Sequence, residues 1–118
     1  MTIRKILTFP DPKLREVAKE VTEFNSDLKS LAEDLIETMY EFKGIGLAAV
    51  QIGVNKRVIV ADVSEEKKEP FIFINPTIRI LNEDEKGGYD EGCLSIPGFY
   101  EEVVRPTQVE ISFQNLSG

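Results

Sequence analysis

The sequence predicts an α+β domain in which one long helix packs on mostly antiparallel strands. One segment, residues 25–44, repeats apolar side chains at helical spacing. Three later segments, residues 56–63, 71–81 and 108–114, are rich in Val, Ile and Phe, which is typical of strands. A chain of 118 residues has the ordinary size of one domain, so residues 1–118 are expected to form a single unit with its own core.

The N-terminal region begins with a short apolar segment that two prolines interrupt. Pro10 and Pro12 flank Asp11. An aspartate side chain accepts hydrogen bonds from the first N–H groups of a helix, and proline is favoured at the first helical position. The spacing therefore predicts a short helix that begins at Pro12, with Asp11 as its cap.

The helix predicted within residues 25–44 carries both start and stop signals. Asn25 or Ser26 is suited to cap it, and Asp27 places a negative charge near the positive end of the helix dipole. Gly44 is expected to end the helix, because glycine is favoured just after a helix C-terminus. The apolar stripe is expected to comprise Leu28, Leu31, Ala32, Leu35, Ile36, Met39 and Phe42.

The glycine-rich region in the second half of the chain predicts little regular structure. Residues 87–98 and 100–104 are expected to form only short extended pieces. The charged residues between the first two predicted strands suggest a solvated connector. No internal repeat or low-complexity tract divides the chain.

The last strand predicted by the sequence alternates apolar and polar residues. Val109, Ile111 and Phe113 alternate with polar neighbours in residues 108–114, which predicts a half-buried strand. Residues 114–118 predict a turn, after which a return strand is expected.

The charge balance argues against several classes of partner. The chain has 14 basic and 21 acidic residues, which gives a net charge of −7. Nucleic acids and anionic membranes require a cationic surface, so direct binding to either is not expected. No apolar run has the length of a membrane span, and the N-terminus lacks the pattern of a secretory signal. One cysteine cannot form an internal disulfide, so a cytoplasmic protein is expected.

The stretch GIGLAAVQIG, residues 44–53, allows two interpretations. It could be a helix stop followed by a tight turn into the next strand. Alternatively, its glycines could leave the backbone open to a ligand, with Gln51 as an oriented hydrogen-bond donor. No lysine–serine or lysine–threonine pair follows it, so it is not a phosphate-binding loop.

Cys93 is the only cysteine and lies among small and turn-forming residues. A lone cysteine often acts as a small core residue. The acidic Asp90 and Glu91 disfavour a nucleophilic thiolate, and the chain has no histidine to act as its base. A metal ion would deprotonate the thiol outright. Cys93 is therefore interpreted as a core residue or a metal ligand rather than a nucleophile.

The two glycine-containing motifs together resemble signatures of the peptide deformylase family. GIGLAAVQIG resembles its first signature, G-φ-G-L-A-A-x-Q, in which φ is apolar, and EGCLSIPG resembles its second, E-G-C-L-S. The opening FPDPKLR, the long helix before the first motif and the INP at residues 74–76 also match. The resemblance covers essentially the whole chain.

The resemblance implies an activity and roles for particular residues. Members of the family remove the formyl group from the initiator methionine of new polypeptides. By this resemblance, Gln51 and the backbone N–H of Leu94 stabilise the oxyanion of the reaction. Gly44, Ile45 and Gly46 pair with the substrate backbone and wall the methionine pocket. The implied partners are the N-formylmethionyl end of a nascent peptide and, through it, the ribosome.

The resemblance also implies a divalent metal, usually Fe²⁺, with Zn²⁺ or Ni²⁺ as alternatives. In the family one cysteine and two histidines hold it, so Cys93 would be the thiolate ligand. The histidines and a catalytic glutamate come from a third signature, H-E-x-x-H, on a C-terminal helix. That signature is missing here, and the 118 residues contain no histidine.

Two hypotheses follow from this departure. The first is a peptide deformylase whose 118-residue chain lacks its C-terminal part and is inactive alone. The second is a non-catalytic short homologue that binds formylmethionyl peptides or a partner protein. Because the absent helix would leave part of the core uncovered, self-association through exposed apolar surface is expected.

Overall fold

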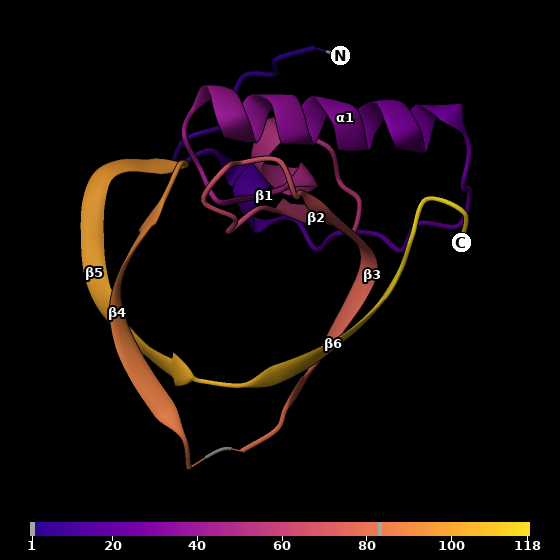
Figure 1. Ribbon diagram of the computed structural model, residues 1–118. Helices are drawn as coiled ribbons and strands as arrows, with labels where there is room; N and C mark the ends of the chain where they lie inside the picture. The colour runs from indigo at the N-terminus through magenta and orange to yellow at the C-terminus, as the bar shows by residue number, and fades with distance from the viewer. Residues whose placement is uncertain (1, 83) are drawn as a thin grey trace.

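The computed structural model describes residues 2–82 and 84–118 and confirms the predicted α+β class (Figure 1). No helix in the described residues is long and apolar enough to cross a membrane. The 3₁₀ helices are η1 and η2, the α-helix is α1, and the strands are β1 to β6. In chain order they are η1 (Pro12–Arg15), α1 (Ser26–Glu41), β1 (Gly46–Ala48), η2 (Ala49–Ile52), β2 (Val58–Ala61), β3 (Phe71–Ile80), β4 (Lys86–Cys93), β5 (Ile96–Pro106) and β6 (Val109–Gln114).

The N-terminal ends of both predicted helices are confirmed. Asp11 caps η1 by accepting a hydrogen bond from the Lys13 backbone N–H at 2.9 Å. Asn25 caps α1 by accepting a hydrogen bond from the Leu28 N–H at 3.1 Å. Each side-chain oxygen satisfies a backbone donor that has no partner within its helix.

The C-terminal end of α1 differs from the prediction. The helix ends at Glu41, and Lys43 rather than Gly44 adopts the left-handed conformation, with φ 57°. The Lys43 N–H donates to the Tyr40 carbonyl at 3.1 Å, and the Gly44 N–H donates to the Met39 carbonyl at 2.9 Å. These two bonds form a Schellman motif, which places the left-handed residue one position earlier than expected.

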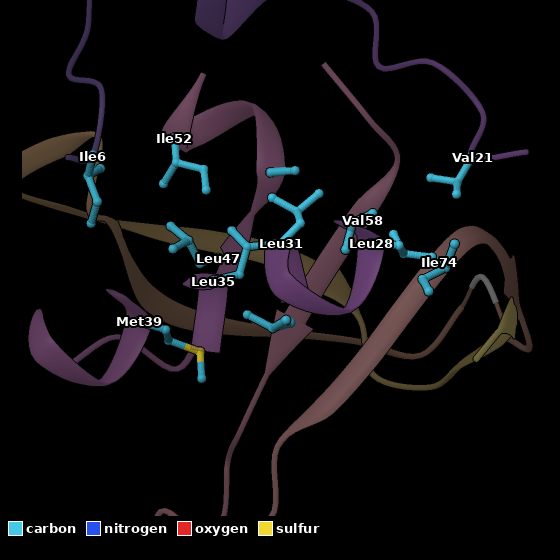
Figure 2. Packing of buried hydrophobic residues seen from close by; sticks show 12 residues of the cluster. Ile6, Val21, Leu28, Leu31, Leu35, Met39, Leu47, Ile52, Val58 and Ile74 are labelled. Atoms are coloured by element: carbon cyan, nitrogen blue, oxygen red, sulfur yellow. The ribbon is translucent and has the colours of Figure 1, made fainter. Parts of the chain in front are cut away.

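The apolar face of α1 packs on β1 and β2 and forms the core (Figure 2). Phe42 does not extend this face as predicted, because it follows the end of the helix and is 48% exposed. Burying one Leu, Ile or Met side chain stabilises a fold by about 1.5–3 kcal/mol. The buried cluster consists of Ile6, Val21, Leu28, Leu31, Leu35, Met39, Leu47, Ala49, Ile52, Val58, Val60 and Ile74.

The strands form two antiparallel sheets. The larger has the order β1-β2-β3-β6, so β1 and β6 are its two edges. The smaller consists of β4 and β5 alone. The predicted strands within residues 56–63, 71–81 and 108–114 are confirmed as β2, β3 and β6.

The short extended pieces predicted for the glycine-rich region are instead a long hairpin. Its strands β4 and β5 have 8 and 11 residues. With β3 and β6 they form one bent ribbon, whose tip curls back toward the N-terminal body (Figure 1). The Phe9 N–H donates to the Ser95 carbonyl at 2.8 Å and ties the tip to that body. This contact brings together segments that are distant in the sequence.

Asn75 produces an irregularity in the middle of β3. It has φ 51°, a conformation that asparagine tolerates better than most residues, and the β3–β6 register shifts at this point. Its side chain accepts from the Val21 N–H at 2.8 Å and donates to the Val21 carbonyl at 2.9 Å. Asn75 therefore holds the segment before α1 against the sheet as a neighbouring strand would.

Residues 108–114 are predicted to form a half-buried strand, but the observed strand β6 is more exposed than predicted. Every residue of β6 is exposed, including Val109 (43%), Ile111 (38%) and Phe113 (46%). The apolar alternation predicts the strand correctly but not its exposure. No element among the described residues covers this face, however, so the apolar side chains stay accessible.

Candidate functional site

A cavity lies where the ribbon tip meets β1 and the loop before it. Its volume is about 1180 Å³, which exceeds the usual size of a small-molecule pocket and leaves room for several residues of an extended peptide. All six residues singled out by sequence line it: Gly44, Ile45, Gly46, Gln51, Cys93 and Leu94. They come from two segments about 40 residues apart in the sequence, which the return of the ribbon brings together.

The side chain of Gln51 is fixed at both ends. Its Oε1 accepts from the Ala48 backbone N–H at 2.9 Å, within the same turn. Its Nε2 donates to the Cys93 Sγ at 3.5 Å and to the Ser95 Oγ at 3.2 Å. The first contact determines which end of the amide faces the cavity, so Gln51 presents a donor there, as the ligand-binding interpretation of residues 44–53 requires.

Ser95 is a site residue that the sequence did not single out. It is 4% exposed, its hydroxyl accepts the Gln51 amide, and its carbonyl accepts the Phe9 N–H. The sequence signal for Ser95 is its position two residues after Cys93 in the motif EGCLSIPG. Its role depends on Gln51 and Phe9 reaching it, and only the tertiary structure shows those contacts.

Cys93 is exposed, so its interpretation as a core residue is wrong. Within residues 2–82 and 84–118, no group of three or more His, Cys, Asp or Glu residues could hold a metal ion. The nearest polar side chains are those of Gln51 and Ser95, and an amide NH₂ is a donor rather than a ligand. The residues present therefore provide one thiolate and do not by themselves fit the metal centre that the resemblance implies.

Gly46 lies on an edge of the larger sheet with its backbone groups directed away from β2. The Asp62 N–H donates to the Ile45 carbonyl at 2.9 Å, so these two residues form a hydrogen-bonded pair. The next pair, Gly46 with Ala61, is then of the non-hydrogen-bonded kind. The N–H and C=O of Gly46 thus point to the free edge of β1, where an extended peptide could pair with them.

Leu94 closes one side of the cavity and packs on the core. Its backbone N–H has no hydrogen-bond partner among the described residues. A Cβ at Gly44 would lie 2.8 Å from the Leu94 Cδ1, so the absence of a side chain at Gly44 permits this approach. The free N–H of Leu94 and the Nε2 of Gln51 are two donors that belong to the same cavity.

A buried carboxylate supports the loop that leads into β1. Asp62 is fully buried and accepts hydrogen bonds from the Ser64 hydroxyl at 2.5 Å and the Tyr40 hydroxyl at 2.5 Å. The Ser64 and Tyr40 hydrogen bonds lower the pKa of Asp62 to about 2. Burial, together with Asp62, raises the pKa of Tyr40 to about 12. The Asp62 backbone N–H holds Ile45, so this network fixes one wall of the cavity.

The acidic residues before Cys93 do not act as a free pair. Arg105 donates from Nε and Nη2 to the Glu91 carboxylate at 2.6 and 2.8 Å. These hydrogen bonds hold the pKa of Glu91 below its usual value. Arg105 therefore partly balances the charge of Glu91, which the sequence predicts to oppose a thiolate at Cys93.

Comparisons with known proteins agree on one family. The model of the polypeptide deformylase family matches residues 3–118. The peptide deformylase of Cellvibrio japonicus is 52% identical over all 118 residues, which cover 69% of the relative. That of Pseudomonas aeruginosa is also 52% identical, with 70% of it covered.

Solved structures show the same likeness. A peptide deformylase from Thermotoga maritima superposes with a TM-score of 0.93 at 40% identity, over 100% of this chain and 78% of that one. A peptide deformylase from Legionella pneumophila gives a TM-score of 0.91 at 43% identity, over 99% of this chain and 68% of that one. The arrangement of helix, sheet and bent ribbon is therefore shared with these proteins.

Proposed function

The chain belongs to the polypeptide deformylase family, and we propose that its cavity binds the N-formylmethionyl end of a nascent polypeptide for hydrolytic removal of the formyl group. The observation that carries this proposal is the fixed amide of Gln51, whose Nε2 lies 3.5 Å from the Cys93 Sγ. A donor held in place before the reaction begins is what a developing oxyanion requires.

The substrate binds as an added strand along the free edge of β1. The N–H and C=O of Gly46 pair with its backbone, which gives affinity for any extended peptide. Ile45, which is 59% exposed, and Leu94 offer apolar surface to a methionine side chain. The formyl oxygen then faces the Leu94 N–H and the Gln51 Nε2.

Hydrolysis is not expected from these 118 residues by themselves. They supply the peptide-binding edge, the two oxyanion donors and one thiolate, Cys93. They contain no histidine, and the described residues include no group of three or more His, Cys, Asp or Glu that could hold a metal ion. The metal preference, with Fe²⁺ first and Zn²⁺ or Ni²⁺ as alternatives, therefore stays an expectation from the family.

A second candidate function is peptide binding without hydrolysis. The feature that favours it is a set of groups suited to contact a peptide, from Gly46, Gln51 and Leu94, all of which line one cavity. The single cysteine favours a cytoplasmic setting for either function, where ribosomes produce formylated chains.

Binding and formate release measured on the same samples test these functions. We expect a labelled formylmethionyl tripeptide to bind the 118-residue chain and to release no formate, with or without added Fe²⁺, Zn²⁺ or Ni²⁺. Metal analysis of the purified chain is expected to show less than stoichiometric metal. Catalytic formate release, or a stoichiometric bound metal, would contradict the incompleteness of the site.

Two matched variants locate the binding. Gln51→Leu removes one hydrogen bond to the formyl oxygen and is expected to weaken binding by about 1 kcal/mol, or roughly fivefold. Gln108→Leu changes the same residue type outside the cavity and is expected to leave affinity unchanged. If both variants bind as the wild type does, or if the unformylated peptide binds equally well, the proposed site is wrong.

A further inference from the structure

We propose that Asp34 is a positioning residue for the site: through the N-terminal segment, residues 2–9, it holds Gln51 where the cavity distinguishes a formylated peptide from an unformylated one. This inference rests on the proposed function and names a determinant of its selectivity. Asp34 belongs to α1 and does not line the cavity. It is only 7% exposed, and because ionisable side chains are rarely buried without partners, its partners indicate its role.

Two buried polar side chains of α1 hold the beginning of the N-terminal segment. The Asp34 carboxylate accepts from the Thr2 N–H at 2.8 Å and from the Arg4 Nε at 2.9 Å. The Arg4 Nη2 also lies 2.8 Å from Asp34 Oδ2. One turn further along the helix, the Thr38 hydroxyl accepts from the Arg4 N–H at 2.8 Å. Hydrogen bonds between charged groups are stronger than those between neutral groups, so Asp34 is the main anchor of the segment.

The other end of the N-terminal segment holds two residues of the site by their backbone. The Leu7 N–H donates to the Gln51 carbonyl at 2.7 Å. The Phe9 N–H donates to the Ser95 carbonyl at 2.8 Å. Ile6 belongs to the buried cluster and fixes the middle of the segment (Figure 2). The segment therefore links α1 both to the turn that carries Gln51 and to the ribbon tip that carries Ser95.

These backbone contacts determine how the Gln51 amide lies relative to the ribbon tip. Its Nε2 donates to the Ser95 Oγ at 3.2 Å, which is at the long end of the usual range. A small displacement of either residue would break this bond. A segment that holds both backbones keeps the Gln51 donor directed at the position of the formyl oxygen, and such preorganisation is what recognition of that oxygen requires.

Asp34→Asn tests the proposal with a side chain of the same shape. In either orientation its amide NH₂ meets another donor, the Thr2 N–H or the Arg4 guanidinium, so one contact of the anchor is lost. The measured quantity is the ratio of the dissociation constants of the unformylated and formylated tripeptides for the 118-residue chain. We expect Asp34→Asn to lower this ratio at least about twofold.

Thr38→Val provides a second test that leaves Asp34 in place. It removes the acceptor of the Arg4 N–H and is expected to lower the same ratio. Far-ultraviolet circular dichroism shows whether each variant is folded, and Thr38→Val decides the question where Asp34→Asn is not. A wild-type ratio in the folded variants would overturn the proposal.

The matched control is Asn25→Ala, which removes the cap of the same helix. It lowers the stability of α1 without changing any contact of the N-terminal segment, so the ratio is expected to stay at the wild-type value. If Asn25→Ala lowers the ratio as much as Asp34→Asn does, the effect comes from a general loosening of the fold, and the positioning role of Asp34 is wrong.

A double-mutant cycle with Gln51→Leu shows whether Asp34 acts through the Gln51 amide. In the Gln51→Leu background, Asp34→Asn is expected to leave the ratio unchanged, because the donor that it would misplace is absent. An equal fall in both backgrounds would overturn the proposal. If the wild-type chain binds the two tripeptides equally, the proposed function fails and this inference fails with it. If the wild type discriminates and the Asp34 and Thr38 variants discriminate equally well, only this inference fails.

Discussion

At the scale of single residues, the site depends on how one amide is oriented. Gln51 directs its Nε2 into the cavity because its Oε1 is occupied by the Ala48 N–H. Ser95 holds the other end at 3.2 Å. The sequence pointed to Gln51 and Cys93 through their motifs, whereas Ser95 gains its role only from the return of the ribbon.

Ser95→Ala removes the hydroxyl that accepts the Gln51 amide. We expect it to lower the free energy of unfolding by about 1 kcal/mol, since the amide loses one buried partner. It should also weaken binding of the formylmethionyl peptide, because the Gln51 Nε2 loses one of the contacts that hold it in position. Urea unfolding and peptide titration measure the two effects. Ser117→Ala, at an exposed position, is the control, and equal behaviour of both variants would contradict a positioning role for Ser95.

Asp62 gives the fold a defined sensitivity to acid. Its folded pKa of about 2 lies below the ordinary value of 3.8, so its contribution to stability is fully present above pH 3.8. That contribution is lost as the pH falls toward 2, because the hydrogen bonds in the folded state stabilise the charged carboxylate and not the protonated carboxyl. Ser64→Ala removes the largest cause of the lowered pKa.

The difference in unfolding free energy between wild type and Ser64→Ala should therefore shrink as the pH is lowered from about 4 to about 2. Urea unfolding at a series of pH values measures it. Ser30→Ala, exposed on α1, should show a difference that does not depend on pH. A constant difference for Ser64→Ala would show that its hydroxyl does not control the ionisation of Asp62.

At the scale of elements, the helix could be predicted almost completely, because its signals are local. The Asn25 cap and the helical spacing of the apolar stripe can both be recognised within the helix itself. The sequence predicts the left-handed residue after α1 one position too late, since a lysine in that conformation has no sequence signal of its own. The length of the β4–β5 hairpin cannot be predicted from the sequence, because its strands are rich in glycine and charged residues and have no buried face that would impose an apolar alternation.

Lys43→Gly tests the strain at the end of α1. A non-glycine residue in the left-handed region costs about 1–3 kcal/mol, whereas glycine adds a smaller entropic cost in the unfolded chain. We expect the variant to raise the unfolding free energy by about 1 kcal/mol. Lys29→Gly, within the same helix, should lower it by a similar amount. A loss of stability in Lys43→Gly would show that the Lys43 side chain makes a compensating contact.

At the scale of the whole molecule, the fold divides into a packed body and an exposed ribbon. The body contains the buried cluster between α1 and the strands β1 and β2. The strands β4 and β5 contribute no buried residue and extend away from that cluster (Figure 1). The class and the body could be predicted from apolar patterns, but the path of the ribbon could not, because the contact between Phe9 and Ser95 links segments that no local signal connects.

This division predicts unequal protection from hydrogen exchange. Amides of Leu35 and Val60, which are fully buried, should exchange only on global unfolding. Paired amides of β4 and β5 should exchange through local opening, at least about tenfold faster, since little apolar burial resists separation of the two strands. Exchange followed by NMR on the 118-residue chain measures both. A saturating formylmethionyl peptide should slow exchange at Leu94 and Ser95, where the tip meets the body, and leave Val104 in the middle of β5 unchanged. Uniform protection throughout the chain would mean that the ribbon and the body unfold as one cooperative unit. The site would then be a rigid part of the fold, and docking of the ribbon tip would not be a separate step in its assembly.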